Sequence, residues 1–519
     1  MQNGAPKGNS RESEIIDVLE THPGVREAAV VRDCVDGYRA FVVPTDSYMD
    51  NVLGRELAGA TVVDRWRKAC ELSQLTKEVA SVPAGFNTIG WNSTYTRQPI
   101  PADEMREWVD TTVAEILKLA PRVVYEIGCG TGMPLLRIAP HCERYVAVDF
   151  SRVVLARLRE QLQTIPAARD RVELQARRAD DFDGLEENSF DTVVLNSVVQ
   201  YFPNATYLTS VLGKAIHVVK PGGHVFVGDT RNLNLLPAFA ASVETFQAAD
   251  ETSAEDLRHR ILRRMEREQE LVVSPAYFLS LKSRFPKLSR VEIQPRCGRA
   301  DNEMTHYRYD AILHVDGETE ASSGDEFHDW EEKMWTLDEI RSMLRLHPNE
   351  RHGIMRIRNA RNERDLAALA ALKGADAAQT AGKLRREYNQ YVAKGIHPQD
   401  CIDLMAEGLE FAVYLSWAAC RPDGSFDVFF VPIASLHRMS KPAIDWPKLE
   451  ASALVRLTNA PGSGKLRNEL VNQLLAHCKQ KLAEDTVPVE IVLVDAMPCL
   501  AGGGVDSLAL LASIEHAAF

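Results

Sequence analysis

The sequence lacks paired cysteines, long uncharged apolar runs and any excess of positive charge. None of its nine cysteines forms a CxxC pair, which argues against a zinc site or a disulfide framework and predicts reduced thiols. No apolar run approaches the length of a membrane span, and the polar start has no signal-like region. The net charge of −13 argues against nucleic acid or an anionic membrane as the main partner. We therefore expect a cytoplasmic protein with no metal site.

The length and composition are those of a folded protein with several domains. The chain has 519 residues, of which 45% are hydrophobic and 26% are charged, and no internal repeat is evident. Two or three domains are expected, with ample apolar content for their cores.

The stretch 122–132, R-V-V-Y-E-I-G-C-G-T-G, carries the clearest functional signal. An apolar run rich in strand formers breaks into Gly128, Gly130 and Gly132, and a helix start follows. Such a turn lets backbone N–H groups approach a nucleotide-type ligand. It is not the dinucleotide fingerprint G-x-G-x-x-G, which would need glycine where Met133 stands.

A second strand, 144–148, leads into Asp149, seventeen residues after Gly132. This is where a carboxylate would accept hydrogen bonds from a ribose diol. The alternative is that Asp149 only caps the helix that begins near Ser151.

Strands and helices then alternate along the chain. Strands are predicted near 122–127, 144–149, 171–175, 190–196 and 222–229, and helices near 133–140, 152–163 and 205–219. This order predicts an α/β fold with a parallel sheet and right-handed crossovers. Two later strands, 290–295 and 306–315, would complete a seven-stranded sheet, whereas the Gly/Ser-rich acidic stretch 317–329 is expected to be a linker.

Several long runs resemble a known family in order and spacing. They are E-I-G-C-G-T-G-M, G-W-N-S-T-Y-T-R-Q-P-I-P and the runs over 179–203, 222–236 and 291–315. Together they resemble the N-methyltransferase domains embedded in nonribosomal peptide synthetases. The resemblance implies a class I, Rossmann-like methyltransferase domain over 50–330, with a helical cap at 236–287 and a C-terminal extension at 331–440. It also implies S-adenosylmethionine (SAM) as the cofactor.

The two ends of the chain resemble a different part of the same synthetases. The runs 14–31 and 487–498 are similar to the C-terminal subdomain of adenylation domains, which predicts a discontinuous α+β remnant over 12–45 and 445–515. The family's Gly-Lys-Val-Asp run is here Gly503-Gly504-Val505-Asp506, and a glycine cannot supply the lysine's cation. Adenylation is therefore not expected. A carrier-protein site at Ser507 is disfavoured because only twelve residues follow it.

The expected cofactor-binding residues lie on the glycine turn, at the carboxyl ends of the next three strands, and on the loop 85–101. Asp149 is assigned to the ribose, Phe150 to the adenine ring, and Asp180 or Asp181 to the adenine amino group. The aromatic residues of the loop either form a lid over the cofactor or pack beneath the loop. The full set is Trp91, Tyr95, Glu126, Gly128, Cys129, Gly130, Gly132, Asp149, Phe150, Ser151, Asp180, Asp181, Phe182, Asn196, Ser197 and Val198.

Methyl transfer from a sulfonium is an in-line displacement in which the protein supplies alignment and electrostatics. A general base is needed only if the acceptor starts protonated, and the candidates are Tyr95, Tyr201, Glu303 and His306. The expected substrate-binding residues are Gln200, Tyr201, Arg296, Arg299 and Arg308. The alternative for each of these three arginines is a place on a solvated basic rim. The alternative for Glu303 is that it is a solvated loop carboxylate.

The preferred expectation for the reaction is O-methylation of a carboxylate on a free, amino-acid-derived or dicarboxylic metabolite. A carboxylate is ionised at neutral pH and needs no base, whereas a free α-amine is largely protonated. The chain thereby resembles stand-alone fungal carboxylate O-methyltransferases of secondary metabolism. The alternatives are N-methylation of an aminoacyl group on the carrier of a nonribosomal peptide synthetase, and an inert scaffold for such a partner. A homodimer is left open.

Overall fold

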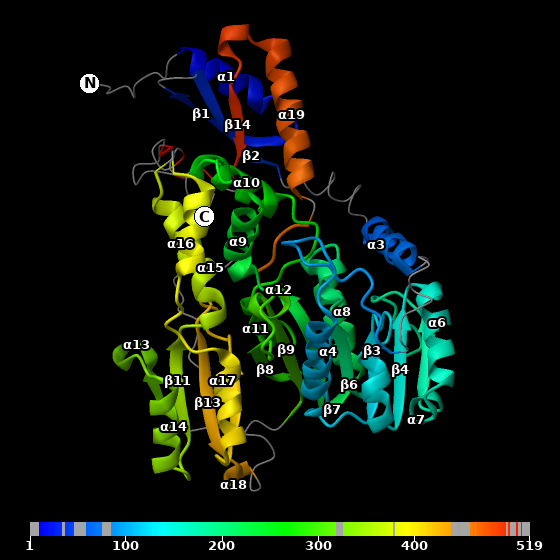
Figure 1. The fold of residues 1–519 in the computed structure, drawn as a ribbon. Helices are drawn as coiled ribbons and strands as arrows, with labels where there is room; N and C mark the ends of the chain where they lie inside the picture. Colours follow the sequence, from blue (N-terminus) through cyan, green and yellow to red (C-terminus); the bar gives the residue numbers. More distant parts are fainter. Residues whose placement is uncertain are drawn as a thin grey trace, which may run out of the picture. The chain divides into compact units, whose positions relative to one another are not determined.

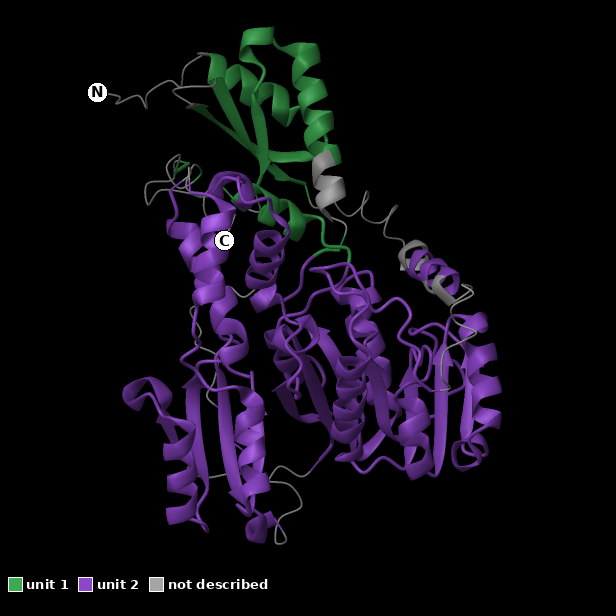
Figure 2. Ribbon diagram, in the orientation of Figure 1, with its two compact units in different colours: residues 1–62, 258–269, 460–519 green, residues 63–257, 270–459 purple. Residues whose placement is uncertain are grey.

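The computed structural model describes residues 10–33, 37–45, 59–74, 85–317, 325–376, 379–436, 444, 446, 457–461, 463–494, 497, 498, 505, 506 and 510. The chain divides into two compact units. Unit 1 comprises residues 1–62, 258–269 and 460–519, and unit 2 comprises 63–257 and 270–459 (Figure 2). Within the described residues, no helix is both long and apolar enough to cross a membrane.

Unit 2 contains a seven-stranded sheet, as predicted, in the order β5-β4-β3-β6-β7-β9-β8 (Figure 1). The first five strands are parallel, and β9 pairs antiparallel with both β7 and β8. This is the class I methyltransferase arrangement. The strands are β3 (Val123–Ile127), β4 (Arg144–Asp149), β5 (Val172–Ala176), β6 (Phe190–Asn196), β7 (Val219–Arg231), β8 (Leu288–Pro295) and β9 (Arg308–Val315).

Helices connect these strands, and most match the predicted positions. The predicted cap at 236–287 contains three helices, but the last of them, α11, packs on β8 and so belongs to the layers around the sheet. The helices are α3 (Gly59–Gln74), α4 (Ala102–Leu117), α5 (Leu135–Ile138), α6 (Arg152–Gln163), α7 (Pro166–Arg169), α8 (Ala205–Val218), α9 (Leu236–Gln247), α10 (Ala254–Glu266), α11 (Pro275–Arg284) and α12 (Glu303–His306).

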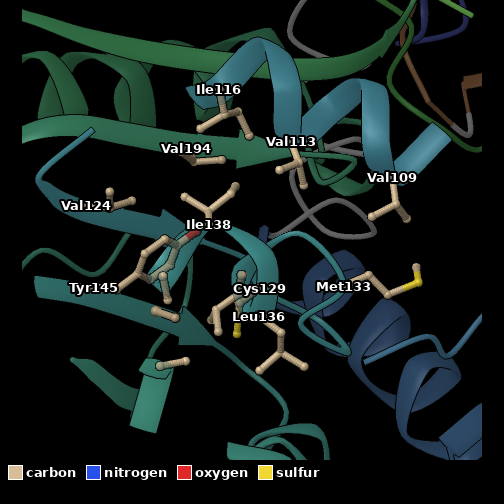
Figure 3. Packing of buried hydrophobic residues seen from close by; sticks show 14 of the residues in the cluster. Val109, Val113, Ile116, Val124, Cys129, Met133, Leu136, Ile138, Tyr145 and Val194 are labelled. Atoms are coloured by element: carbon tan, nitrogen blue, oxygen red, sulfur yellow. The ribbon is translucent and has the colours of Figure 1, made fainter. Parts of the chain in front are cut away.

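The core beneath the glycine turn is formed by one face of the sheet and the helices α4 and α5 (Figure 3). Val109, Val113 and Ile116 recur at helical spacing along α4, and they meet Val124 of β3 and Val194 of β6 (Figure 3). Apolar residues at i, i+4 and i+7 form one stripe, which explains why α4 buries this face. The packing fixes the strand ends from which the site is built.

The C-terminal extension of unit 2 forms a second sheet, in the order β10-β11-β13-β12. β10 lies inside the stretch 317–329 that was predicted to be a linker, and this part of the prediction is wrong. The ring of Phe327 lies 5.3 Å from that of Phe429, so apolar packing holds the segment. The elements are β10 (Phe327–Asp329), α13 (Trp330–Lys333), α14 (Leu337–Leu346), β11 (His352–Ile357), α15 (Ala360–Gly374), α16 (Ala381–Gln390), α17 (Pro398–Asp403), β12 (Phe411–Ser416), β13 (Phe426–Pro432) and α18 (Ile433–Leu436).

Unit 1 joins the two ends of the chain in one small sheet. β14 (Glu490–Leu493) lies parallel to β2 (Gly37–Pro44), which pairs antiparallel with β1 (Val25–Asp33). Helices α1 (Ser10–Glu20) and α19 (Ser463–Lys481) share a core cluster with this sheet. The positions on which the adenylation and carrier-site predictions depend, Gly503, Gly504 and Ser507, lie outside the described residues.

Candidate active site

The glycine turn after β3 has the backbone conformation that only glycine adopts readily. Gly128, Gly130 and Gly132 have φ values of +74°, +49° and +77°. A Cβ at Gly128 would lie 2.5 Å from Val198, and one at Gly132 would lie 2.5 Å from Leu158. A Cβ at Gly130 would meet nothing within 4 Å, so the turn is open at its centre. The two outer glycines are thus required by packing, and the central one faces room for a ligand.

Asp149 sits at the end of β4 directly beside this turn. Its Oδ2 accepts a hydrogen bond from the Gly130 amide at 3.0 Å, and its Oδ1 accepts one from the Ser151 amide at 2.8 Å. The residue is only 5% exposed. Burial raises the pKa of Asp149 to about 6, against the lowering effect of these amides. The carboxylate therefore braces the turn and still has lone pairs for further donors.

Three residues predicted to bind the cofactor instead support the turn from within the protein. The buried Glu126 accepts a hydrogen bond from the Tyr145 hydroxyl at 3.1 Å, and burial raises its pKa to about 8. Cys129 is buried, and its amide donates to the Val148 carbonyl. Ser151 is fully buried and caps α6 through the Val154 amide. These contacts support the fold, and the assignment of the three residues to the cofactor stays a prediction.

The end of β5 leads to the residues assigned to adenine. Asp180 is half-buried, and although burial opposes it, hydrogen bonds from Tyr207 and Arg178 lower its pKa. Asp181 lies 3.6 Å from Arg177 and accepts the Asp183 amide. The ring of Phe182 packs 5.6 Å from that of Tyr125. Phe150 is half-buried just after β4. These assignments stay predictions.

Polar residues follow β6, at the same edge of the sheet. Ser197 has a left-handed backbone, with φ of +56°, and its hydroxyl donates to Asp229 Oδ2 at 2.6 Å. Gln200 Nε2 donates to Ser197 Oγ at 3.2 Å. The side-chain oxygens of Asn196 and Gln200 are buried and accept no hydrogen bond from the protein. Two unpaired buried acceptors are costly unless a ligand supplies donors.

Asp229, at the end of β7, is the site residue that sequence reasoning missed. Its Oδ1 accepts the Trp108 indole N–H at 3.0 Å, and its Oδ2 lies 2.6 Å from Arg308 Nη1. It is fully buried and has a left-handed backbone, with φ of +60°. The rule that ligands bind at the carboxyl ends of parallel strands could have found it, because β7 is the neighbour of β6.

The three arginines expected to hold a substrate carboxylate are already paired. Arg296 is 2% exposed and donates to both oxygens of Asp310, at 3.1 and 3.2 Å. Arg308 pairs with Asp229, and Arg299 contacts Asp400 and Asp403 at 2.7 and 2.6 Å. Burial explains the compensation of Arg296 and Arg308, whereas the Arg299 side chain is exposed. The assignment of these arginines to substrate binding stays a prediction, and their ion pairs weigh against it.

The loop 85–101 lies across this edge of the sheet and is held at its start and near its middle. Arg137 donates to the Gly85 carbonyl at 3.0 Å, beside the glycine turn. Near the middle of the loop, Glu303 accepts the Thr94 amide at 2.6 Å and the Ser93 hydroxyl at 3.3 Å. Glu303 is buried, so the alternative of a solvated carboxylate is wrong. Glu303 holds the loop through these contacts, and its expected role as a base stays a prediction.

Trp91 and Tyr95, two of the aromatic residues of the loop, contact the protein beneath it. The ring of Trp91 lies 4.9 Å from that of Trp108, whose indole reaches Asp229. Tyr95 Oη lies 2.7 Å from Ser242 Oγ of α9 and 3.5 Å from Tyr307 Oη. The loop thus connects the cofactor turn to residues near the end of β7.

A buried set of hydroxyl groups surrounds a single carboxylate here. Tyr307 donates to Asp365 Oδ2, and Tyr388 donates to Asp365 Oδ1 at 2.7 Å. His306 Nδ1 lies 3.9 Å from Asp365, and its Nε2 lies 2.9 Å from Asp301. We call the residues Tyr95, Ser242, Tyr307, Asp365 and Tyr388 the hydroxyl cluster. No motif in the sequence marks Asp365, which lies among the polar residues at the start of α15.

The remaining predicted residues are placed around β6. The Tyr201 ring packs 4.8 Å from that of Trp66 in α3. Val198 fills the space opposite Gly128 and therefore packs against the turn. Within the described residues, no group of three or more His, Cys, Asp or Glu side chains could hold a metal ion.

The fold and the site define a class I methyltransferase, and comparisons with known proteins agree. A family model described as a methyltransferase domain matches residues 125–225. Chondramide synthase of Chondromyces crocatus is 37% identical over 514 residues, which cover 96% of this chain. The beauvericin nonribosomal cyclodepsipeptide synthetase of Beauveria bassiana is 30% identical, again over 96% of this chain.

This chain spans only 13% and 16% of the lengths of those two relatives. Among solved structures, the N-methyltransferase NodS of Bradyrhizobium japonicum with S-adenosyl-L-homocysteine is 16% identical, with a TM-score of 0.31, covering 48% of this chain and 97% of that one. Residues 125–225 are thus similar to a methyltransferase domain, and the chain is similar to one part of nonribosomal peptide synthetases. The expected resemblance is confirmed.

The residues present fit SAM. The open centre of the turn at Gly130 admits the ligand, and the Asp149 carboxylate beside it has capacity for the ribose hydroxyls. The unpaired oxygens of Asn196 and Gln200 lie after the neighbouring strand, where further donors are needed. When bound, SAM supplies an electrophilic methyl carbon on its sulfonium.

Proposed function

We propose that this chain methylates the nitrogen of an aminoacyl group presented by a nonribosomal peptide synthetase partner. The supporting observation is the pair of buried acceptors without donors, Asn196 Oδ1 and Gln200 Oε1. An amine brings N–H donors to such oxygens. A carboxylate brings only more acceptors, which would leave them unsatisfied and add repulsion.

The charges around the acceptor side support the same proposal. The preference for carboxylate O-methylation depended on arginines that could hold a second carboxylate. Those arginines pair with Asp310, Asp229, Asp400 and Asp403 instead. Arg296, Arg299 and Arg308 are therefore not free to bind an anionic acceptor. An amine matches the site better.

In this proposal the protein contributes alignment and a dry environment. The turn at Gly130 and the carboxylate of Asp149 hold the cofactor on one side. Asn196 and Gln200 orient the acceptor nitrogen on the other, so that its lone pair points along the line of displacement. Trp91, on the loop 85–101, limits the access of water to this edge.

The test uses an aminoacyl thioester of N-acetylcysteamine as the probe, with free amino acids and dicarboxylic acids in parallel. We expect a methylated product from the thioester whose methyl group survives mild alkaline hydrolysis. A product that loses its methyl group as methanol would establish O-methylation instead. Absence of SAM binding at millimolar concentration would leave the scaffold hypothesis.

A substitution at one of the two unpaired buried oxygens tests whether the site contacts the acceptor nitrogen. Gln200→Leu should raise the KM for the thioester about tenfold, because a hydrogen bond to a buried acceptor is worth about 1–3 kcal/mol. Gln163→Leu on the exposed face of α6 is the matched control and should leave the KM unchanged. Equal KM values for both variants would argue against a contact between Gln200 and the acceptor.

The flanking unit and the partners are also part of the proposal. We infer that unit 1 is a structural remnant of an adenylation subdomain and does not activate amino acids. Pyrophosphate–ATP exchange with a panel of amino acids should stay at background. Sedimentation velocity will decide whether the chain forms a homodimer.

A further inference from the structure

The hydroxyl cluster has a fixed direction of hydrogen bonding, which follows from counting its protons. Each hydroxyl has one proton to donate. Tyr307 and Tyr388 give theirs to Asp365, and Ser242 gives its own to the Phe239 carbonyl at 3.0 Å. The proton of Tyr95 must then point inward, to Ser242 at 2.7 Å or to Tyr307 at 3.5 Å. The outer lone pairs of the Tyr95 oxygen are left as acceptors.

The cluster therefore forms a one-way chain from the loop to a buried anion. It starts at Tyr95 on the half-buried loop and passes Ser242 or Tyr307. It ends at Asp365, which is 1% exposed. Tyr307 precedes Arg308, and Arg308 pairs with Asp229 at the end of β7. The chain thus begins at the same sheet edge as the acceptor side of the site.

The titratable groups that face this chain lie on α12, on the segment just before it, and on α15 and α16. On α12, His306 stands between Asp301 and Asp365, and Glu303 acts on Tyr95. On α15, Arg364 acts on Asp365 and stacks 4.5 Å from the Tyr388 ring of α16. Burial disfavours the imidazolium of His306, but the two aspartates outweigh it and raise its pKa. Burial, then the charge of Asp365, raises the pKa of Tyr95, so its hydroxyl stays protonated and can relay a proton.

We propose that the hydroxyl cluster takes a proton from the acceptor ammonium and delivers it to Asp365, so that the nitrogen becomes nucleophilic. This inference rests on the proposed N-methylation. Tyr95 touches the acceptor, and Asp365 acts through it as a positioning and charge-storing residue. The C-terminal extension thus contributes to the chemistry of the methyltransferase domain through α15.

An N–H bond of the ammonium breaks, and its proton goes to the Tyr95 oxygen. The Tyr95 proton passes to Ser242 Oγ, and the Ser242 proton turns from the Phe239 carbonyl to Tyr307 Oη, which lies 3.1 Å away. The Tyr307 proton passes to Asp365. The products are a neutral amine, a neutral serine, neutral tyrosines and a protonated Asp365. The amine lone pair then forms the new N–C bond while the C–S bond breaks and its electron pair stays on sulfur. The proton on Asp365 returns to solvent when the product leaves.

The first test measures methylation of the aminoacyl thioester against pH in Tyr95→Phe and Asp365→Asn. A positioned base contributes about 10²–10⁴-fold. We expect a loss of at least tenfold at pH 6.5 that shrinks as pH rises and the free amine becomes abundant. Tyr391→Phe, at the C-cap of α16 and outside the hydroxyl cluster, is the matched control and should keep the wild-type rate at every pH. Losses that are equal at every pH would overturn the proposal.

The second test needs no SAM. In wild type, the affinity for the thioester should be independent of pH below the pKa of its amine, because the proton stays in the protein. In Tyr95→Phe and Asp365→Asn only the neutral amine fits, so the affinity should fall about tenfold for each pH unit below that pKa. A flat profile in the variants would overturn the relay. A wild type that binds but yields no N-methyl product would instead refute the proposed function.

Discussion

The cofactor side and the acceptor side of the sheet edge are built in different ways. The cofactor side uses the glycine turn and Asp149, which come from consecutive strands and interact through backbone amides. The acceptor side joins Tyr95, Asp229, Tyr307 and Asp365, which are far apart in sequence and interact through side chains. One side is fixed by the local path of the chain, and the other depends on long-range packing.

This difference has energetic consequences. Of the two backbone amides freed by a substitution at Asp149, that of Gly130 lies in a half-buried turn, and only that of Ser151 is buried. A side chain freed on the acceptor side, such as Arg308 or Tyr307, stays buried without a partner. Buried polar networks are stable only when every member is satisfied. We therefore expect acceptor-side substitutions to affect folding most, and cofactor-side ones to affect binding.

The largest effect is expected for Asp229→Asn. Asparagine tolerates the left-handed backbone at this position, so the main change is the lost charge opposite Arg308. Breaking a buried ion pair from one side costs about 3–5 kcal/mol, to be measured by urea unfolding. The control is Glu143→Gln, which removes an exposed pair with Arg122 and should leave the midpoint unchanged.

The companion substitution Arg308→Met decides whether the pair itself is responsible. Adding it to Asp229→Asn should recover part of the loss, because no unpaired charge would then remain. If the double variant is no more stable than Asp229→Asn alone, the ion pair is not the source of the effect. That outcome would remove the energetic contrast between the two sides.

The second prediction concerns Asp149→Ala on the cofactor side. The variant should fold and should bind SAM at least about tenfold more weakly, because charge-assisted hydrogen bonds contribute about 1.5–3 kcal/mol each. Calorimetry measures this, with Asp170→Asn on an exposed carboxylate as the control. Unchanged affinity in Asp149→Ala would exclude Asp149 as the ribose ligand.

The pKa of Asp149 gives this prediction a pH dependence. Its pKa is raised to about 6 without ligand, so the carboxyl takes up a proton as pH falls through 6. Ribose hydroxyls need the ionised acceptor, and SAM affinity should therefore decrease below pH 6 in wild type only. The ionised form destabilises the unliganded fold above that pH, because a raised carboxyl pKa favours the neutral state.

The sequence predicted the cofactor side more fully than the acceptor side. The reason is that the cofactor side depends on the local path of the chain, whereas the acceptor side depends on long-range packing. Strand periodicity and the turn at 128–132 are local signals, and they placed the seven strands and Asp149. Asp365 lies among the polar residues at the start of α15, where no motif marks it. The ion pairs of the arginines could not be predicted, because their partners, such as Asp310 and Asp400, lie on elements brought near only by tertiary packing.

The third prediction tests which glycine of the turn is required by packing and which one leaves space for the ligand. In Gly132→Ala the new Cβ would lie 2.5 Å from Leu158, and overpacking of this kind costs about 1–3 kcal/mol. In Gly130→Ala the Cβ meets open space, so stability should fall less while SAM binding weakens. Thermal unfolding and calorimetry measure the two. The reverse ranking of stabilities would mean that the turn is packed differently.

The smallest effect is expected for Glu303→Gln, which tests the clamp on the loop 85–101. The amide keeps one acceptor oxygen but loses the charge that strengthens the bond from Thr94, a loss of about 1 kcal/mol. Amide exchange at Thr94 should quicken several-fold while the exchange of β6 is unchanged. Glu107→Gln is the control, since Glu107 accepts the amides of Arg299 and Ala300 and should affect only those. If both variants quicken exchange at Thr94 equally, the loop opens with the rest of this edge, and Glu303 does not hold it on its own.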